Sequence, residues 1–528
     1  MRCRPVAKAA LALVIVGVAA AACTTGGESA RNLANNDTTV AASSTSTAAA
    51  EGATTAVPST TLPAVVGVAP GTTAPLDPPS AGWVDPRSFA KPWAGKTVGL
   101  LTFKGNPTRS WQGLGPLPAK PKVQWRFPAT GSMCAQSSSL GETKVWCGMG
   151  WTGQPNVLER SDGSTWVLFG GYDDAYHVLD ASTGTAVKPR LPTGDLPKGT
   201  GTLDPDGFPL WYMGARDGKL RVMALDRDEL TVLYEFTAKS VKPTLWNDDW
   251  DAAPLALDDY LFAGGENSRW HIFKLNRGYG PDGKVTVTPQ LVFHAAGWDD
   301  QLLKDIGDRN VGIENSLAIR GNTVWFANSG GLVQGWDISG LRQGRMPTRT
   351  FRFWMGDDVD ASIIPDDKGF LWVGSQFQRK TAQGTKVGQL VKLDPSKPAD
   401  PVVWSIKDQT QFAFQSAAGV WGTPVVLDDV VIANTAGGRL MGLDRATGAE
   451  LWTLRLAPAT INSPVVVDGV LVMGDCRGVL HGYDVRNPRV VPTELWQVEL
   501  GGCIESTPAV WKGRIYVGTR GGALWALG

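Results

Sequence analysis

Histidine, cysteine and net charge are all scarce in this chain of 528 residues. It has 4 His, 6 Cys, and 50 Lys and Arg balanced by 50 Asp and Glu. Proteins that bind nucleic acid normally carry a basic excess, so the balance argues against a nucleic-acid partner. The histidines show no metal-ligand spacing, and no P-loop, Gly-x-Ser-x-Gly elbow or zinc-protease motif is present. The sequence therefore contains none of these familiar catalytic signatures.

The N-terminal apolar run is too short to cross a membrane. A positively charged start precedes 14 uncharged residues, 9–22, whereas a spanning helix needs about 20. The run ends Ala20-Ala-Ala-Cys23, which resembles a bacterial lipoprotein signal, although Leu is usual where Ala20 stands. We predict a signal peptide over 1–23 with Cys23 lipidated, which would hold the protein at the outer face of the bacterial membrane. Ordinary cleavage at an Ala-x-Ala site is the alternative.

Residues 24–80 are rich in Thr, Ser, Ala, Gly and Pro, and no aromatic residue precedes Trp83. Such a segment cannot bury enough apolar surface to offset its ordering entropy, so we predict a disordered tether. A lead-in segment over 81–121 and one folded domain over 122–528 follow it.

Glycine and tryptophan are plentiful, with 63 and 22 residues, and they mark a repeat. Copies such as 463–474 and 507–518 read as strand, Asp-Gly or Lys-Gly turn, strand, which is a hairpin signal. The first turn of the unit recurs at Gly163, Gly207, Asp259, Asn322, Gly369, Asp429, Gly469 and Gly513. These spacings, apart from visible insertions, match four-stranded propeller blades of about 40–50 residues. We predict an all-β, eight-bladed β-propeller.

The eighth unit stops after three strands at Gly528, and its missing outer strand has a candidate far upstream. Residues 122–127 (Lys-Val-Gln-Trp-Arg-Phe) match the outer-strand pattern of the other units. Pairing this N-terminal strand with the last three would close the ring and leave no open sheet edge there.

These units resemble the PQQ-type propeller repeat of quinoprotein dehydrogenases and of the propeller lipoprotein of the outer-membrane assembly machine. The resemblance covers about 97–528 and includes the lead-in Phe103-Lys-Gly-Asn-Pro-Thr-Arg-Ser110. In this family an outer-strand Trp packs on the next blade. The resemblance implies that structural role for Trp125, Trp404, Trp452 and Trp496.

The resemblance implies two functions. In the dehydrogenases PQQ lies in the central funnel beside calcium, often near a disulfide of adjacent cysteines. This chain has neither adjacent cysteines nor a Cys-x-x-Cys-His haem segment, and the family's ligand set cannot be placed on it. We therefore predict a scaffold that binds envelope or cell-surface proteins and requires no cofactor. The alternative is a PQQ- and calcium-dependent dehydrogenase acting on an alcohol or sugar.

Four blades carry an acid where the inner strand begins: Asp251, Glu314, Asp360 and Glu505. On a propeller these carboxylates should ring one mouth of the channel. Converging acids have raised pKa values unless a cation lies among them, and oxygen ligands suit Ca²⁺ or Mg²⁺. The hypothesis is a site for a divalent cation or a basic partner segment, and solvated loop carboxylates are the alternative. Trp250 and Trp421 should lie near this mouth, as a partner site or as packing.

With Cys3 in the signal and Cys23 assigned to lipid, four cysteines remain and allow three connectivities. Placed on the blades, Cys476 and Cys503 lie on one face of neighbouring blades, and Cys134 and Cys147 share the link into blade 1. We predict the disulfides Cys476–Cys503 and Cys134–Cys147.

Overall fold

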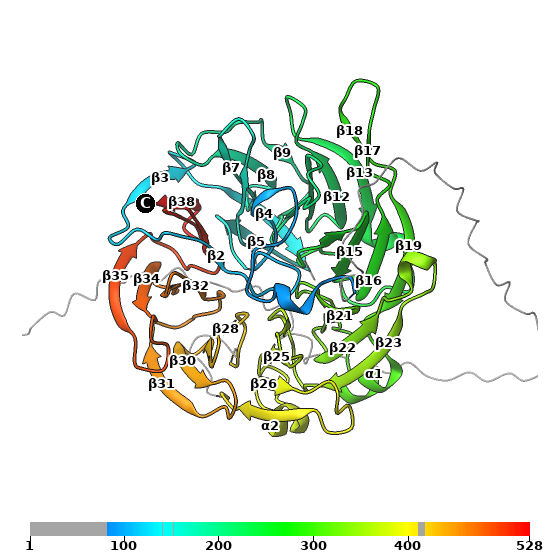
Figure 1. Ribbon diagram of the computed structural model, residues 1–528, viewed down its shortest axis with the longest axis vertical. Coiled ribbons are helices and arrows are strands. Elements are labelled where there is room, and N and C mark those ends of the chain that lie inside the picture. Colours follow the sequence, from blue (N-terminus) through cyan, green and yellow to red (C-terminus); the bar gives the residue numbers. More distant parts are fainter. Residues whose placement is uncertain (1–81, 140, 152, 410–417) are drawn as a thin grey trace, which may run out of the picture.

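Eight sheets, antiparallel apart from one short parallel pair in the last, form a closed ring around one channel in the computed structural model (Figure 1). The structure describes residues 82–139, 141–151, 153–409 and 418–528. The predicted signal peptide, Cys23 and the tether lie outside these residues. Within the described part, no helix is both long and apolar enough to cross a membrane. Each sheet starts beside the channel and adds strands outward, so the predicted eight-bladed, all-β propeller is confirmed.

The predicted first turn of every unit lies between the first and second strands of a blade. The β-branched residues that flank these turns supply the alternating, half-buried pattern that strands need. The strands of blades 1 to 4, from the channel outward, are β6 (Asn156–Glu159), β7 (Thr165–Gly171), β8 (Ala175–Asp180) and β9 (Leu191–Pro192); β10 (Thr202–Leu203), β11 (Leu210–Gly214), β12 (Lys219–Ala224) and β13 (Thr231–Thr237); β14 (Leu255–Leu257), β15 (Tyr260–Gly265), β16 (Arg269–Lys274) and β19 (Gln290–Ala296); and β20 (Ala318–Arg320), β21 (Thr323–Phe326), β22 (Leu332–Asp337) and β23 (Thr348–Trp354).

The strands of blades 5 to 8 follow the same order: β24 (Ile364–Pro365), β25 (Leu371–Gly374), β26 (Leu390–Leu393) and β27 (Val402–Ile406); β28 (Val425–Val426), β29 (Val430–Asn434), β30 (Arg439–Asp444) and β31 (Glu450–Arg455); β32 (Val465–Val467), β33 (Val470–Gly474), β34 (Val479–Asp484) and β35 (Thr493–Glu499); and β36 (Ala509–Trp511), β37 (Arg514–Thr519), β38 (Ala523–Leu527) and β3 (Val123–Phe127).

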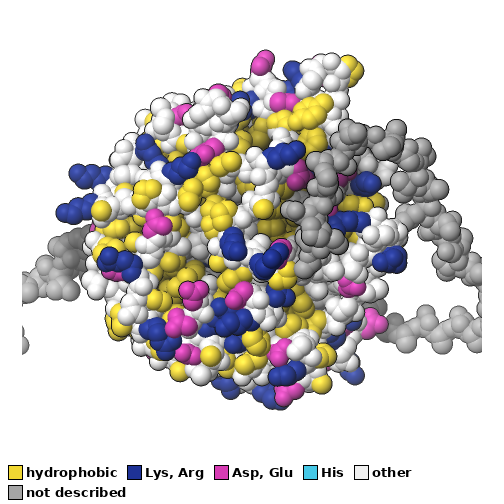
Figure 2. Space-filling model, viewed as in Figure 1, with side chains coloured by type: hydrophobic (Ala, Val, Ile, Leu, Met, Phe, Trp, Pro, Cys, Tyr) yellow, Lys and Arg dark blue, Asp and Glu magenta, His cyan; other side chains and the backbone are white. Residues whose placement is uncertain are grey.

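Insertions between strands carry the few other elements. One insertion forms the helix α1 (Asp300–Ile306), which Asp299 caps by accepting a bond from Leu302 N–H. On the side drawn in Figure 2, acidic, basic and hydrophobic side chains are interspersed over the blades. The insertions and links contain β4 (Cys134–Ser139), β5 (Glu142–Cys147), β17 (Gly278–Tyr279), β18 (Val285–Thr286), α1 (Asp300–Ile306), α2 (Ala382–Val387), η2 (Pro86–Ser88), η3 (Ala238–Ser240) and η4 (Leu341–Gln343).

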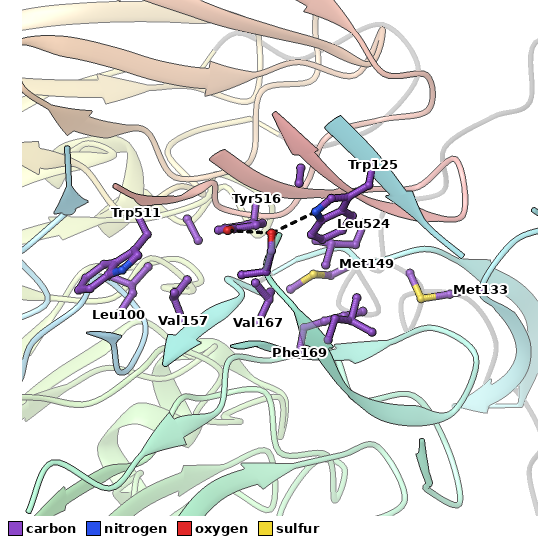
Figure 3. Close-up of a cluster of buried hydrophobic side chains, with 14 of the residues drawn as sticks. Leu100, Trp125, Met133, Met149, Val157, Val167, Phe169, Trp511, Tyr516 and Leu524 are labelled. Carbon is purple, nitrogen blue, oxygen red and sulfur yellow. Dashed lines mark hydrogen bonds between the residues drawn. The ribbon is translucent and has the colours of Figure 1, made fainter. Parts of the chain in front are cut away.

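Ring closure occurs between blade 8 and blade 1, as the sequence predicts. Strand β3 pairs antiparallel with β38 and completes blade 8. The indole of Trp125 and the hydroxyl of Tyr516 both donate to the carbonyl of Ala181 in blade 1, at 3.1 and 3.3 Å (Figure 3). Trp125 also lies so close to Gly184 that a Cβ there would meet its ring at 2.6 Å. The carbonyl of Ala181 and the backbone at Gly184 are therefore the parts of blade 1 that contact Trp125 of blade 8.

The other three predicted blade tryptophans also reach the following blade. Trp404 lies over Gly448 and donates to the carbonyl of Arg445 at 3.3 Å. Trp452 donates to the carbonyl of Pro488 at 2.7 Å. Trp496 packs in a cluster with core residues of blade 8. The structure thus places these rings at successive blade junctions.

The lead-in segment forms part of the propeller and fills its axis. β1 (Val98–Leu100) adds to β6 as a fifth, innermost strand of blade 1, and β2 (Gly113–Leu114) adds to β36 in blade 8. Between them, residues 101–112 pass through the middle of the ring, where the blue chain lies in Figure 1. We call residues 101–112 the plug. The lead-in over 81–121 therefore contributes directly to the blades.

Two buried cations fix the plug to blade carbonyls. Lys104 Nζ donates to the carbonyl of Pro464 at 2.7 Å. Arg109 donates from Nε to the carbonyl of Leu317 at 2.8 Å and from Nη2 to that of Ala253 at 3.0 Å. Both side chains are fully buried, and burial lowers the pKa of Lys104 to about 7 and that of Arg109 to about 9. The plug thereby joins blades 3, 4 and 7 across the axis.

Replacing the closure tryptophan, Trp125→Ala, is expected to destabilise the protein by about 3–5 kcal/mol, because a buried indole and its hydrogen bond are lost. Trp404→Ala, the matched control, removes a ring that is only partly buried, and should cost less. The measurement is the midpoint of urea unfolding for both variants. Equal midpoints would contradict a special contribution of the closure junction.

The stability of Lys104→Met relative to the wild type is expected to be highest near pH 7 and to fall as pH rises. The folded chain holds the pKa of Lys104 at about 7, below its usual 10.5, so the unfolded chain binds more protons between these values. Wild-type stability from this group is therefore lowest below pH 7 and recovers as pH rises toward 10. Melting curves at pH 7, 8.5 and 10 should show the difference in melting temperature moving in favour of the wild type. A gap that stays constant with pH would refute the assignment.

Candidate functional site

The candidate site is the end of the channel at which the inner strands begin, here called the channel mouth. The links that enter the blades form its rim, and the turns between second and third strands surround it. Sequence alignment of the blades predicts acids at this end. The structure shows a more ordered arrangement, because hydroxyls, paired cations and aromatic rings share the mouth with the acids.

A ring of hydroxyl side chains lines the mouth from blade 4 to blade 8. In most of these blades the backbone N–H just before the inner strand donates to the hydroxyl of the next blade, as Ser316 does to Ser362 and Thr423 does to Ser463, each at 2.9 Å. The same bond joins Ala253 to Ser316 and Ser362 to Thr423, also at 2.9 Å. These bonds fix the relative height of neighbouring blades. They also leave polar oxygens around the axis.

One carboxylate group at the mouth is neutralised by a buried lysine. Oxygens of Asp249, Asp251 and Glu266 converge within 4.8 Å of one another. Lys198 Nζ lies among them, 2.6 Å from Asp251, 3.5 Å from Asp249 and 3.6 Å from Glu266. Burial disfavours the ammonium, but these carboxylates outweigh it and raise the pKa of Lys198 well above its usual value. The Lys198 ammonium therefore occupies the position that a metal ion would take among these three acids.

Glu505 is separated from the other predicted acids by its own cation. Arg520 Nε lies 3.8 Å from Glu505, and Arg216 Nε lies 3.0 Å from Asp249. The ring of Trp146 lies near both guanidinium groups, 4.6 Å from that of Arg520 and 5.7 Å from that of Arg216. Burial raises the pKa of Glu505, and Arg520 opposes that rise. Two arginines and one indole thus cover the blade 8 to blade 2 side of the mouth.

Both disulfides lie in links or turns of the chain. Cys134–Cys147 closes the β4–β5 hairpin that carries Trp146, and Cys476–Cys503 joins a turn of blade 7 to the link into blade 8. The hairpin would otherwise be an isolated two-stranded ribbon, which is marginal in water. The first disulfide therefore holds the hairpin closed, with Trp146 beside the two arginines.

Glu314 and Asp360 differ from the paired acids. Within the described ranges, neither forms an ion pair. Glu314 accepts a bond from Ser329 Oγ at 2.8 Å, and Asp360 Oδ2 accepts one from Gln376. Asp360 is 4% exposed and shares a side-chain hydrogen bond with Asp358. Burial and the Asp358 carboxylate raise the pKa of Glu314 to about 8 and that of Asp360 well above its usual value, to which Glu314 and Asp251 also contribute.

These two acids line a small pocket at the mouth, here called the mouth pocket. Its room for water-sized probes is about 10 Å³, which is about one water molecule. Phe103 of the plug, Trp151 and Trp421 form its apolar part, and the rings of Trp151 and Trp421 lie 5.3 Å apart. The hydroxyls complete the wall: Ser316, Ser362, Thr423, Ser463 and Thr507. Trp250 is buried against Phe236 and His271, which is the packing alternative for that residue.

Sequence reasoning placed the four acids at one mouth but missed the residues that decide their charge. Lys198, Arg216 and Arg520 come from links and turns outside the aligned strand starts. The hydroxyl ring did leave a signal, because Thr423, Ser463 and Thr507 each precede proline in the repeat. A metal ion at the four acids remains a prediction.

The fold is an eight-bladed propeller, and part of its repeat matches a known family. Residues 321–492 match the family described as outer membrane protein assembly factor BamB. One curated relative is 1-butanol dehydrogenase (cytochrome c) of Thauera butanivorans, 28% identical over 156 residues that cover 27% of this chain and 22% of the relative. Another is outer membrane protein assembly factor BamB of Moranella endobia, 28% identical over 120 residues that cover 20% of this chain and 30% of the relative. The matched stretches thus span less than a third of either relative.

Two solved structures match most of the length of the chain at low identity. Quinohemoprotein alcohol dehydrogenase from Comamonas testosteroni has a TM-score of 0.48 at 12% identity, covering 81% of this chain and 80% of that one. BamB from Moraxella catarrhalis has a TM-score of 0.36 at 13% identity, covering 77% of this chain and 97% of that one.

Lys198→Met is expected to destabilise the protein by about 3–5 kcal/mol, because it leaves three buried carboxylates without their ammonium. Lys239→Met is the matched control. Lys239 pairs with Asp248 at 2.7 Å, but the two side chains are 68% and 33% exposed, and such surface pairs contribute about 0–1 kcal/mol. Urea unfolding of both variants measures the difference. An equally small loss of stability in both variants would show that the three carboxylates do not require the Lys198 ammonium.

Proposed function

We propose that this chain is a protein-binding scaffold of the bacterial cell envelope, attached to the outer face of the membrane through lipid on Cys23 and extended from it by residues 24–80. The observation that carries the proposal is the plug. Residues 101–112 fill the axis with side chains bonded to blade carbonyls, so the channel is occupied by the protein itself. The space left at the mouth is about 10 Å³ for water-sized probes, enough for about one water molecule and far below typical small-molecule sites.

Two further observations support a partner-binding role. The matched family is described as an assembly factor, and that description supports an assembly role for this chain as well. The outer edge of blade 7 also exposes three aliphatic side chains close together in sequence: Val490 (53%), Val491 (58%) and Leu495 (45%). Leu495 lies on β35, the outermost strand of that blade, whose free edge can accept another strand. Apolar surface beside an unpaired edge suits contact with another protein.

The second candidate is a PQQ- and calcium-dependent dehydrogenase, which the match to 1-butanol dehydrogenase favours. The carboxylate oxygens of Glu314 and Asp360, which line the mouth pocket, are of the kind that Ca²⁺ prefers. PQQ itself fits less well, because it is a planar polycarboxylate and the described mouth pocket is small and lined by two acids and no base. No catalytic step is therefore derived for this chain.

Proximity labelling from the full-length protein on intact cells should tag a small, reproducible set of envelope proteins. The double variant Val491→Asp and Leu495→Asp should lose at least one of them, because charge at the blade 7 edge disfavours apolar contact. Met346→Asp is the matched control, since Met346 is 50% exposed on another blade. Labelling no greater than that of an unrelated exported protein would contradict the scaffold proposal. So would oxidation of an alcohol or sugar by protein reconstituted with PQQ and Ca²⁺.

A further inference from the structure

One of the four histidines of the chain is held between two acids in blade 7. His481 lies on β34 and is 8% exposed. Its Nδ1 lies 2.7 Å from Glu494 Oε1, and its Nε2 lies 3.5 Å from Asp475 Oδ2. Glu494 is on β35, the outermost strand of the blade, whereas Asp475 is in the turn between β33 and β34. His481 therefore joins the outer edge of the blade to a turn at the channel mouth.

The two carboxylates determine the form of the imidazole. A carboxylate only accepts hydrogen bonds, whereas a neutral imidazole has one N–H and one lone pair. The neutral ring would direct its lone pair at one of the acids, so only the imidazolium can donate to both. Burial lowers the pKa of His481, but Asp475 and Glu494 outweigh burial and raise that pKa above its usual value. Burial raises the pKa of Asp475, but His481 and the backbone N–H of Val479 outweigh it and lower that pKa.

The other neighbours of His481 on its own strand, on the adjacent strands and on blade 6 are uncharged at neutral pH: Tyr483, Met473, Gln497, Leu440 and Trp452. Two charged residues of the same region are exposed. Glu499 lies on β35 opposite Val479, and Arg477 follows Asp475 in the turn. Solvent screens such exposed charges, so Asp475 and Glu494 dominate the environment of the imidazole.

The Glu494 end of this network belongs to the surface that the scaffold proposal offers to a partner. Glu494 directly precedes the exposed Leu495 on β35, and Val490 and Val491 lie just before that strand. Strand β35 pairs with β34 on one side only, at the rim of the ring (Figure 1). The ladder between them shifts register at Tyr483, opposite Glu494. An outer strand of this kind opens locally at low cost, so a charge-assisted bond from β34 to Glu494 is well placed to hold it.

From this geometry we propose that His481 is a pH-sensitive latch between Asp475 and Glu494, which holds β35 on blade 7 while the imidazole is protonated and loosens this edge when the proton leaves. The latch belongs to the protein alone, and its role in partner binding rests on the scaffold function. A histidine whose pKa is raised on folding stabilises the fold fully below its unfolded pKa, near 6.5, and loses that effect as pH rises through the folded value. The edge is therefore held at pH 6 and looser at pH 8.5.

The test measures amide hydrogen exchange of β35 in the full chain at pH 6 and pH 8.5, corrected for intrinsic rates and divided by that of β31, the outer strand of blade 6. The ratio removes global changes, such as that from Lys104. Relative protection of β35 should fall by about fivefold, the approximate difference between a charge-assisted and a neutral hydrogen bond. His481→Gln should abolish this change. His177→Gln is the matched control, because His177 pairs with Asp173 at 2.9 Å in blade 1 and should leave β35 as in the wild type.

Melting curves establish that the variants fold. Glu494→Gln, at a side chain that is 40% exposed, is a second variant that should also reduce the pH dependence. A wild-type ratio that does not change with pH would overturn the proposal, and so would a change that persists undiminished in His481→Gln or in Glu494→Gln. The exchange measurement needs no partner, so its failure is distinct from failure of the scaffold proposal, which proximity labelling tests.

Discussion

A ring of sheets must both close its circumference and fill its axis, and one stretch of this chain meets both demands. Residues 98–127 add a strand to blade 1, pass through the channel, add a strand to blade 8 and then complete that blade as β3. The eight blades would otherwise meet around an empty core with an open edge. Lys104 and Arg109 satisfy blade carbonyls that face the axis, at the cost of burying two cations. The propeller therefore depends on a segment that precedes most of it in the sequence.

The plug also determines what the channel can do. Because the plug fills the axis, chemistry is confined to the mouth, where Phe103 forms part of the pocket. Around that pocket the protein neutralises some of its own acids and leaves others. Lys198 balances the cluster at Asp251, and Arg520 balances Glu505, while burial and neighbouring carboxylates raise the pKa values of Glu314 and Asp360. Burial of the acids at the mouth is thus compensated by a paired cation for some and by a raised pKa for others.

Much of the fold follows from local pattern. The turn residues Gly163 to Gly513 predict all eight blades. Each strand–turn–strand unit consists of consecutive residues, and side chains along a strand alternate between its two faces with a period of two, so the pattern is visible in the sequence. The closing strand could be found because Trp125 repeats the outer-strand pattern. The lead-in was harder to place: nothing in the Phe103–Ser110 motif indicates that its Lys and Arg point into a channel.

For the site, the sequence by itself determined which acids stand at the start of the inner strands and therefore at one mouth. Only the tertiary structure decided their charge state. Lys198 reaches Asp251 from the link into blade 2, and Arg520 reaches Glu505 from the turn between the second and third strands of blade 8. These ion pairs depend on the positions of the loops relative to one another in the folded ring. The periodicity of a single strand does not predict those positions. Propeller geometry brings these loops within hydrogen-bond distance, so the difference between an acid paired with a cation and one with a raised pKa arises only in the folded ring.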